Sequence, residues 1–441
     1  MDTVKKTFMP EIATEEELKA LQLEGLKWTA RHAYNGSDVY RQRFDDAGVA
    51  PEDIKSLEDI RKLPFTTNKD LQNGYPFPLV CVPMNDVVRI HASSGTTGKR
   101  KVLCYTQKDI DIWTQFFARC YELAGLTTED KIQISSGYGV WTAGVSFQAA
   151  AEAFGAMAIP IGPGNIDMQL QFMEDFQTTV MTCTASMALL LAEEVNRRGL
   201  KDKLTLKKII FGSERASDAM RQRIKELLGV EEMFDISGMT ELYGPGAGLD
   251  CHYHTGIHYW ADTYILEILN PETLEPVAAG EIGEMVVTTL KKEAVPLVRY
   301  RTRDLTRLIP GRCSCGSIFP RHDRFLGRSD DMIVFRGVNT FPGHIDQILS
   351  TFSDAALECG NIGCEYKIVL DRKDDGREYM QLLVERGMEA EAEKDPQLEQ
   401  LIKSRIKKEI LISADVKIVD YGALPRNETG KTKRVEDNRY R

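Results

Sequence analysis

The segment HASSGTTGKRK, residues 91–101, holds residue types that bind phosphate. Two glycines and four hydroxyl residues fall within six positions, so backbone amides and hydroxyls can converge on phosphate oxygens, and Lys99 adds a positive charge. The P-loop of kinases and nucleoside triphosphatases has four residues between its glycines, whereas Gly95 and Gly98 enclose two. A polar surface turn has the same composition. Taken alone, the segment leaves a polyphosphate site and a surface turn equally open.

A second set of residues has the chemistry of a metal site, and four of them are expected to act together: Cys251, His258, Cys313 and Cys315. The last two form a C-x-C pair in the glycine-flanked segment GRCSCGS. Thiolates and imidazole together suit a tetrahedral zinc ion, and four protein ligands indicate a structural role. His252 and His254 are alternatives to His258, and unrelated free cysteines are the competing interpretation. A zinc ion here would pin the β-rich region that these residues flank.

The elements that would position these residues alternate along the chain. From about residue 80 to 310, short apolar runs and helix-like stretches predict α/β layers with a largely parallel sheet. Between 263 and 310 the apolar runs predict antiparallel strands of a β-rich subdomain. After 327–331 a helix, strands and a basic tail predict a compact α+β unit. The expected fold is therefore α/β, with a large multi-layer N-terminal domain at 1–328 and a small α+β C-terminal domain at 329–441.

The bulk composition limits the function classes. The chain has 441 residues and a formal net charge of −10, which gives no electrostatic footprint for nucleic acid. No segment approaches the roughly 20 apolar residues of a membrane span, and the N-terminus lacks the apolar core of a signal peptide. The nine cysteines are scattered and odd in number, which argues against a complete disulfide framework. A cytoplasmic protein that acts on small molecules is expected.

The glycine-rich segment is the first of several resemblances. SSGTTGK is similar to the signature of adenylate-forming enzymes, whose loop holds the β and γ phosphates of ATP and then pyrophosphate. Segments that resemble later signatures of this superfamily follow in order: FGSE at 211–214, FDISGMTELYGPG at 234–246, RYRTRD at 299–304, GRSDD at 327–331 and LPRNETGKTKR at 424–434. The block GRSDDMIVFRGVNTFP and the short N-terminal part look like the phenylacetate-CoA ligase family within the superfamily.

The resemblance implies an ATP site. Its phosphate-binding residues would be Ser93, Ser94, Gly95, Thr96, Thr97, Gly98 and Lys99. Gly212, Ser213 and Glu214 would line the adenine, and Asp304 would accept hydrogen bonds from both ribose hydroxyls, as an ionised carboxylate can. Arg328 would lie near the ribose and the phosphates. The sequence departs from the family pattern at Arg303, where the family usually has glycine.

The resemblance also implies catalytic roles. Thr240 would reach the α-phosphate, Glu241 would ligate magnesium, and Lys431 would be the catalytic lysine of the C-terminal domain. Asp330 would be the hinge on which that domain turns between the two half-reactions. The segment SSGYGVWTAG at 135–144 resembles the acid pocket of the family, in which Tyr138 and Trp141 would form aromatic walls. Core packing is an equally good interpretation of these two rings.

The function that follows is an ATP-dependent CoA ligase that activates an aryl acid, phenylacetate or a close analogue, through an acyl-adenylate. Coenzyme A would displace AMP, and the cofactors would be ATP, magnesium and a structural zinc. One alternative is a free-standing adenylation enzyme that loads a carrier-protein thiol. Another is a non-catalytic nucleotide-binding regulator on the same fold. The resemblance further suggests a homodimer.

Overall fold

The computed structural model describes residues 7–77, 79–93, 100–214, 216, 218–329, 333–335, 338–353, 360–372, 377–388, 390–425 and 434–439. The chain forms two compact units. The first comprises Met1–Cys183, Lys203–Ser213 and Glu231–Arg324. The second comprises Thr184–Asp202, Glu214–Val230 and Phe325–Arg441, so it includes two segments that lie between parts of the first unit in the sequence. A domain boundary at residues 328 and 329 stays a prediction.

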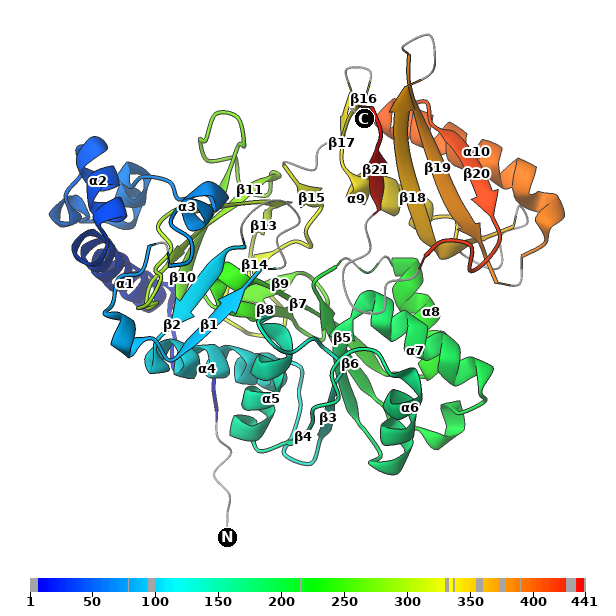
Figure 1. Cartoon of the computed structure of the whole chain (residues 1–441), viewed down its shortest axis with the longest axis horizontal. Helices are drawn as coiled ribbons and strands as arrows, with labels where there is room; N and C mark the ends of the chain where they lie inside the picture. Colours follow the sequence, from blue (N-terminus) through cyan, green and yellow to red (C-terminus); the bar gives the residue numbers. More distant parts are fainter. Residues whose placement is uncertain are drawn as a thin grey trace. The chain divides into compact units, whose positions relative to one another are not determined.

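The first unit is built on a sheet of nine strands among the described residues, in the order β13-β14-β9-β8-β7-β6-β5-β3-β4 (Figure 1). The strands are β3 (Lys131–Ile134), β4 (Met157–Ile159), β5 (Val180–Thr184), β6 (Lys208–Gly212), β7 (Glu232–Met239), β8 (Gly244–Asp250), β9 (Ile257–Tyr259), β13 (Leu308–Ile309) and β14 (Arg321–His322). β3 pairs in parallel with β4 and β5, and β6 pairs in parallel with β7. From β7 through β8, β9 and β14 to β13 the pairing is antiparallel. The predicted parallel α/β sheet is confirmed for one half of this sheet.

Continuous burial explains the parallel half. Four consecutive residues of β5 and the last four of β6 are buried, which is typical of strands covered on both faces. Helices α4 (Gln107–Leu123), α5 (Ala143–Phe154) and α6 (Ile166–Asp175) belong to the same unit. α4 begins at a capping box in which the Thr106 hydroxyl accepts from the Asp109 amide at 3.1 Å. Its Phe117 packs edge-to-face on Phe147 of α5, with ring centroids 4.8 Å apart.

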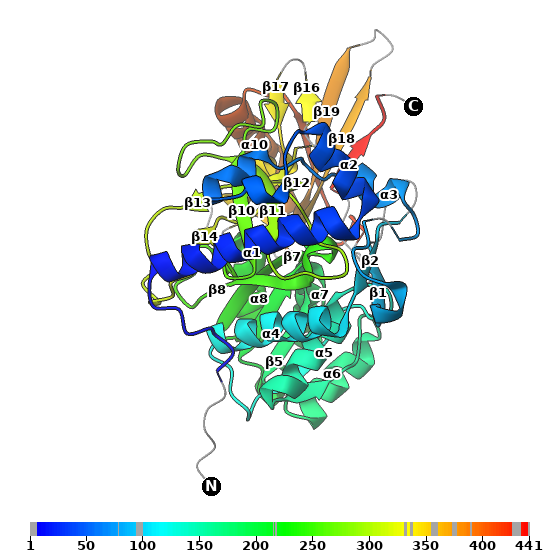
Figure 2. The same ribbon diagram turned by 90° about the vertical axis from the view of Figure 1, so that its left-hand side faces the viewer.

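A second sheet of the first unit contains the antiparallel strands β10 (Tyr264–Leu269), β11 (Gly283–Thr289) and β12 (Tyr300–Thr306). The predicted β-rich region is thereby confirmed. Helix α1 (Glu15–Gly36) runs across this sheet (Figure 2), and the Thr29 hydroxyl donates to the Thr289 carbonyl at 2.6 Å. A separate hairpin, β1 (Arg89–Ala92) with β2 (Val102–Tyr105), flanks residues 94–99.

The second unit has a four-stranded sheet in the order β20-β19-β18-β21. Its elements are α7 (Ala185–Arg197), α8 (Asp218–Leu228), β16 (Ile333–Phe335), β17 (Val338–Thr340), α9 (Pro342–Ser350), β18 (Ile362–Arg372), β19 (Glu378–Arg386), α10 (Asp395–Ile410), β20 (Asp415–Val419) and β21 (Val435–Asp437). α10 lies along the sheet (Figure 1) and buries Leu398, Ile402 and Ile406, which share one helix face at four-residue spacing. The expected α+β composition of the C-terminal region is confirmed.

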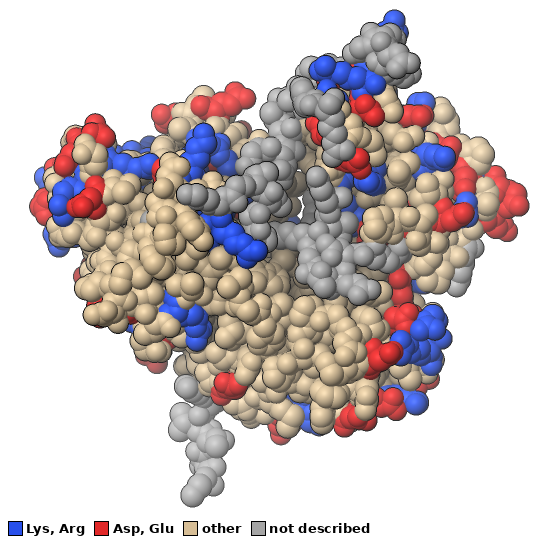
Figure 3. Space-filling model, viewed as in Figure 1, with Lys and Arg blue, Asp and Glu red and all other residues tan. Residues whose placement is uncertain are grey.

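The surface carries both signs of charge. On the face shown in Figure 3, Lys and Arg side chains lie among Asp and Glu side chains. No helix within the described residues has the length and apolarity needed to cross a membrane.

Candidate active site

The segment with Thr240 and Glu241 forms a tight turn at the carboxyl end of β7. A 3-10 turn, η5 (Thr240–Leu242), follows β7, and β8 runs back antiparallel to it. Tyr243 (φ 64°) and Gly244 (φ 87°) both have left-handed backbones. A Cβ on Gly244 would lie 2.8 Å from the Cβ of Thr142, so the turn requires glycine at this position. Ligands bind outside the carboxyl ends of parallel strands in α/β sheets, which is where this turn lies.

The Glu241 carboxylate is buried, with 5% of the residue exposed. One carboxylate oxygen, Oε1, forms an ion pair with the Lys101 ammonium and lies 3.0 Å from the Tyr300 hydroxyl. Lys101 also donates to the side-chain oxygen of Asn68 at 3.1 Å, and the Tyr300 hydroxyl contacts that same oxygen. Burial on its own raises the pKa of Glu241, but the Lys101 charge and the hydrogen bonds outweigh it and hold that pKa below its usual value. The carboxylate is therefore ionised at neutral pH.

Lys101 connects this turn to the predicted phosphate loop. The Ser93 amide donates to the Lys101 carbonyl at 3.0 Å, next to the last pair of the β1–β2 hairpin. The described ends of the loop therefore lie beside Glu241, and Ser93 itself is half-buried. Six predicted phosphate ligands lie outside the described residues and stay predictions: Ser94, Gly95, Thr96, Thr97, Gly98 and Lys99.

Two side chains from other segments form hydrogen bonds with the main chain of the turn. Tyr105, from β2, donates its hydroxyl to the Thr240 carbonyl at 2.9 Å. Lys292, between β11 and β12, donates to the Glu241 carbonyl at 2.6 Å and is fully buried. Burial lowers the pKa of Lys292 to about 8, although the carboxylates of Asp109 and Glu241 act in the opposite direction. Both carbonyls of the predicted catalytic pair are therefore fixed by side chains from other segments.

The predicted adenine segment begins where β6 ends. Gly212 is the last residue of β6, and a Cβ there would lie 2.5 Å from the Ile236 carbonyl oxygen, so glycine allows the ends of β6 and β7 to approach closely. Ser213 has a left-handed backbone, with φ 71°. In the second unit, the Glu214 carboxylate accepts from the Ser186 amide at 2.6 Å and from the Ser186 hydroxyl. Adenine binding by these residues stays a prediction.

Asp304 lies on β12 and is half-buried, and its amide donates to the Thr302 hydroxyl at 3.0 Å. The preceding Arg303 has a left-handed φ of 70°, a conformation that favours glycine. This backbone gives a physical reason for the glycine that the family usually has at that position. Arg328 is half-buried in β15 (Gly327–Arg328). Asp330 and Lys431 lie outside the described residues, so the hinge and the catalytic lysine stay predictions.

Tyr138 and Trp141 are both half-buried in the loop that precedes α5. The loop is closed by a hydrogen bond of 2.9 Å from the Gly144 amide to the Gly137 carbonyl, and each ring covers one of these glycines. Burial raises the pKa of Tyr138 to about 12, and its hydroxyl has no hydrogen-bond partner among the described residues. Neither ring is fully enclosed, which fits a pocket wall, and the role in acid binding stays a prediction.

The predicted metal ligands come together in the first unit. Cys251 follows β8, His258 lies on β9, and Cys313 and Cys315 lie between β13 and β14. Their ligand atoms all lie within 4.8 Å of one another. The Sγ atoms of Cys251 and Cys313 are 3.6 Å apart, and Cys315 Sγ is 3.4 Å from His258 Nε2.

The imidazole of His258 is oriented by its second nitrogen, Nδ1, which lies 2.9 Å from the Phe319 carbonyl oxygen. A proton on Nδ1 leaves Nε2 available as a ligand. His254 instead contacts Asp250 at 2.9 Å, and the described cluster does not include His252. Among the three histidines considered from the sequence, His258 is the one that the structure places with the cysteines.

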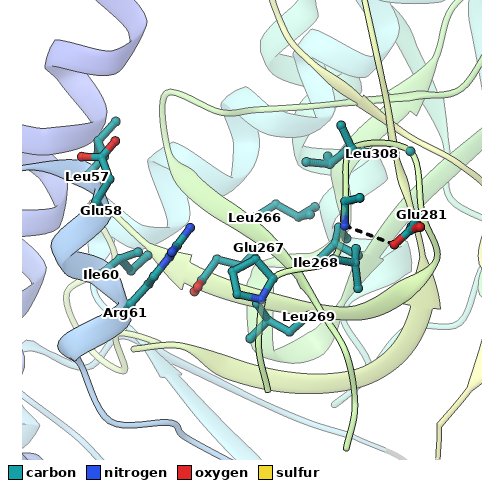
Figure 4. Close-up of a pocket in the computed structure, with 15 residues that line it drawn as sticks. Leu57, Glu58, Ile60, Arg61, Leu266, Glu267, Ile268, Leu269, Glu281 and Leu308 are labelled. Carbon is teal, nitrogen blue, oxygen red and sulfur yellow. Dashed lines mark hydrogen bonds between the residues drawn. The ribbon is translucent and has the colours of Figure 1, made fainter. Parts of the chain in front are cut away.

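A cavity of about 300 Å³ lies elsewhere in the first unit (Figure 4). It is lined by residues of the segment 57–61, by β10, by the loop 276–281 and by Leu308. The residues that line it include none of the predicted site residues.

The comparisons with known proteins agree with this arrangement. A model of the AMP-binding enzyme family matches residues 17–290, and a model of the AMP-binding enzyme C-terminal domain matches residues 337–439. The chain is 42% identical over 434 residues to a phenylacetate-coenzyme A ligase of Escherichia coli K12, and the match covers 97% of each chain. It is 36% identical to a phenylacetate-coenzyme A ligase of Thermus thermophilus, with 98% of this chain and 99% of the relative covered.

Among solved structures, the chain resembles a 2-hydroxyisobutyryl-CoA ligase in complex with 2-HIB-AMP in its postadenylation state. The TM-score is 0.87 at 25% identity, and the match covers 97% of this chain and 91% of the solved chain. Another structure of that ligase, with 2-HIB-AMP and CoA in the thioesterification state, matches with a TM-score of 0.70.

The pairing of Lys101 with Glu241 makes a prediction about stability. Glu241→Gln is expected to lower the free energy of unfolding by about 1–3 kcal/mol, because it leaves a largely buried ammonium without its counter-charge. Lys101→Met is expected to cost a similar amount, because it leaves the buried carboxylate unpaired. The double variant is expected to recover part of the loss. Denaturant unfolding of the wild type, the two single variants and the double variant measures this coupling. A loss of stability in the double variant equal to the sum of the two single losses would contradict the pairing.

Proposed function

The chain belongs to the AMP-binding enzymes and, within them, to the phenylacetate-CoA ligase family, and we propose from this premise that its acid substrate is phenylacetate or a close aryl analogue. The chain is an ATP-dependent, AMP-forming acid-CoA ligase. The choice of acid is supported by the phenylacetate-coenzyme A ligases that match nearly the whole chain. The structural observation that supports ATP binding is the contact of Lys101 with Glu241, because Lys101 lies at the base of the predicted phosphate loop and Glu241 is the predicted magnesium ligand.

In the first half-reaction, the substrate carboxylate attacks the α-phosphate of ATP and pyrophosphate leaves. Thr240 and Lys431 stabilise the charge that develops at the α-phosphate, and residues 93–99 hold the departing pyrophosphate. Asp304 and Arg328 hold the ribose, while Gly212, Ser213 and Glu214 line the adenine. An acyl-adenylate results, and it already contains a good leaving group, so the chain needs no nucleophile of its own.

The site by Glu241 has the chemistry that magnesium requires. Magnesium prefers oxygen ligands, and the Glu241 carboxylate and the Asn68 amide oxygen both face the Lys101 ammonium. Because a cationic group already binds between these oxygens, the site can stabilise positive charge. Glu241 would be the principal ligand, and the ion would neutralise phosphate charge when bound.

In the second half-reaction, the C-terminal domain turns about Asp330, which withdraws Lys431, and the thiolate of coenzyme A displaces AMP from the acyl-adenylate. Hinges of this kind need only a few residues that change their backbone angles. This sequence of events rests on the resemblance to the family. Tyr138 and Trp141 form aromatic walls for the acid, which suits a substrate with an aryl ring.

The two alternative functions are not favoured. The relatives that cover nearly the whole chain are CoA ligases, whereas a nonribosomal peptide synthetase matches only 22% of the chain. A homodimer stays a prediction.

We further infer that the four-residue Cys/His cluster binds a structural zinc. Zinc with S and N bonds of about 2.3 Å and about 2.1 Å places tetrahedral ligands about 3.5–3.8 Å apart. The distances of 3.6 Å and 3.4 Å within the cluster are close to that spacing. With four protein ligands no coordination position is left for substrate, so the ion would act on stability and not on the reaction.

The function is tested with the purified chain, ATP, magnesium and a panel of aryl acids. Acyl-CoA and AMP are expected in equal amounts when free coenzyme A is the only thiol present, with phenylacetate or a close analogue giving the highest kcat/KM. The measurement is chromatography of the nucleotide and thioester products. Formation of acyl-AMP that coenzyme A does not consume would favour the carrier-loading alternative, and absence of AMP with every acid would favour the regulator.

The zinc site predicts about one zinc ion per chain. Cys313→Ser is expected to reduce the bound zinc and to lower the melting temperature, because ligand binding is coupled to folding. Elemental analysis and thermal unfolding measure both effects. Cys364→Ser, which changes a half-buried cysteine in the other unit, is the matched control and should keep the zinc. The site would be wrong if protein prepared without chelator contained no zinc, or if the Cys313/Cys315 double serine variant kept all of it.

A further inference from the structure

Lys292 is fully buried, although lysine is among the residues that are least often buried. Its ammonium donates to the Glu241 carbonyl at 2.6 Å. It also lies 4.9 Å from the ring centroid of Tyr105 and 5.0 Å from that of Tyr243, within the range of cation–π attraction. A buried ammonium is costly unless such partners compensate it. These contacts hold the Lys292 side chain against the turn that carries Thr240 and Glu241.

The backbone that carries Lys292 is also anchored. The Asp109 carboxylate, on α4, accepts from the amides of Glu293 at 2.8 Å and Ala294 at 2.9 Å. Asp109 and the Glu241 carboxylate also attract the Lys292 ammonium electrostatically. The lysine is thus fixed at both its main chain and its side chain, so it can hold the turn in one position.

The turn needs such support because its backbone is unusual. η5 has three residues, and it is followed by left-handed conformations at Tyr243 and Gly244. A non-glycine residue such as Tyr243 is strained in the left-handed region and persists there only where the surroundings fix it. Tyr105 holds the Thr240 carbonyl and Lys292 holds the Glu241 carbonyl, so two consecutive peptide groups are clamped. These two contacts fix the backbone from which both side chains project.

We propose that Lys292 is a positioning residue for adenylation: by holding the Glu241 carbonyl, together with Tyr105 on the Thr240 carbonyl, it fixes the orientation of Thr240 and Glu241 toward ATP. The proposal rests on the function proposed above. Lys292 acts through the main chain of the turn, and its own contact is with the carbonyl and not with a substrate.

The test separates the two half-reactions in Lys292→Met, which keeps a long apolar side chain and removes the ammonium. Adenylation, followed as ATP–pyrophosphate exchange, is expected to lose about 10–100-fold in kcat, because small displacements of catalytic groups have effects of this size. KM for the acid should change little, because Tyr138 and Trp141 are on another segment. The second half-reaction is started from synthetic acyl-adenylate and coenzyme A. Its rate should stay within about threefold of wild type, because this step involves neither pyrophosphate nor the metal that accompanies it.

Lys291→Met is the matched control, because this neighbouring lysine is about half exposed and pairs with Asp262 at 3.8 Å instead of contacting the turn. It should leave both half-reactions near wild type. If Lys292→Met does not fold, Tyr105→Phe removes only the hydroxyl on the Thr240 carbonyl and is expected to reduce adenylation selectively as well. If Lys292→Met folds, the Lys292→Met/Tyr105→Phe double variant should lose less adenylation activity than the product of the two single losses, because both residues act on one turn.

Equal losses in the two half-reactions, or wild-type adenylation in Lys292→Met, would overturn the proposal while leaving the function intact. A wild-type chain that forms neither acyl-adenylate nor acyl-CoA with any acid would overturn the proposed function, and this inference with it. Selective loss of adenylation in Lys292→Met, with both half-reactions kept in Lys291→Met, is the supporting result.

Discussion

The buried Glu241 carboxylate is the constraint on which the rest of the site depends. A carboxylate with so little exposure stays ionised only if positive charge and hydrogen-bond donors compensate its lost hydration. Lys101 and Tyr300 supply that compensation from segments 140 and 59 residues away in the sequence. Satisfying one charged group therefore brings together the β1–β2 hairpin, the turn after β7 and strand β12. This charge compensation places the described ends of the predicted phosphate loop beside the predicted magnesium ligand.

Strand β8 links the two sites of the first unit. It begins at Gly244, directly after the turn that carries Glu241, and ends at Asp250, directly before Cys251 of the Cys/His cluster. Seven strand residues span roughly 20 Å when extended, so the cluster lies at the opposite end of β8 from the turn. The cluster instead ties the far end of β8 to β9 and to the segment before β14. Its expected influence on the turn is through the stability of the strand that they share.

The sequence alone predicted much of this arrangement, because signatures that occur in a fixed order identify a fold even where each is weak by itself. The parallel and antiparallel regions, the clustering of Cys251, His258, Cys313 and Cys315, and the ligase family were all predictable. Asn68, Lys101, Tyr300 and Lys292 were missed as site residues. Lys101 ends the glycine-rich segment 91–101, which was an available signal, but Asn68 and Tyr300 reach Glu241 only through tertiary packing. Lys292 lies in an apolar stretch, TTLKKEAVPLV, and nothing in its local pattern distinguishes it from the exposed Lys291.

We propose that ATP binds with its metal at Glu241, beside the loop whose base is Lys101. The most direct measurement is a crystal structure of the chain with ATP and Mn²⁺, in which anomalous scattering locates the metal. We expect an anomalous peak about 2.0–2.3 Å from a Glu241 carboxylate oxygen, in contact with the triphosphate. A peak elsewhere on the nucleotide, with the Lys101–Glu241 ion pair unchanged, would contradict it.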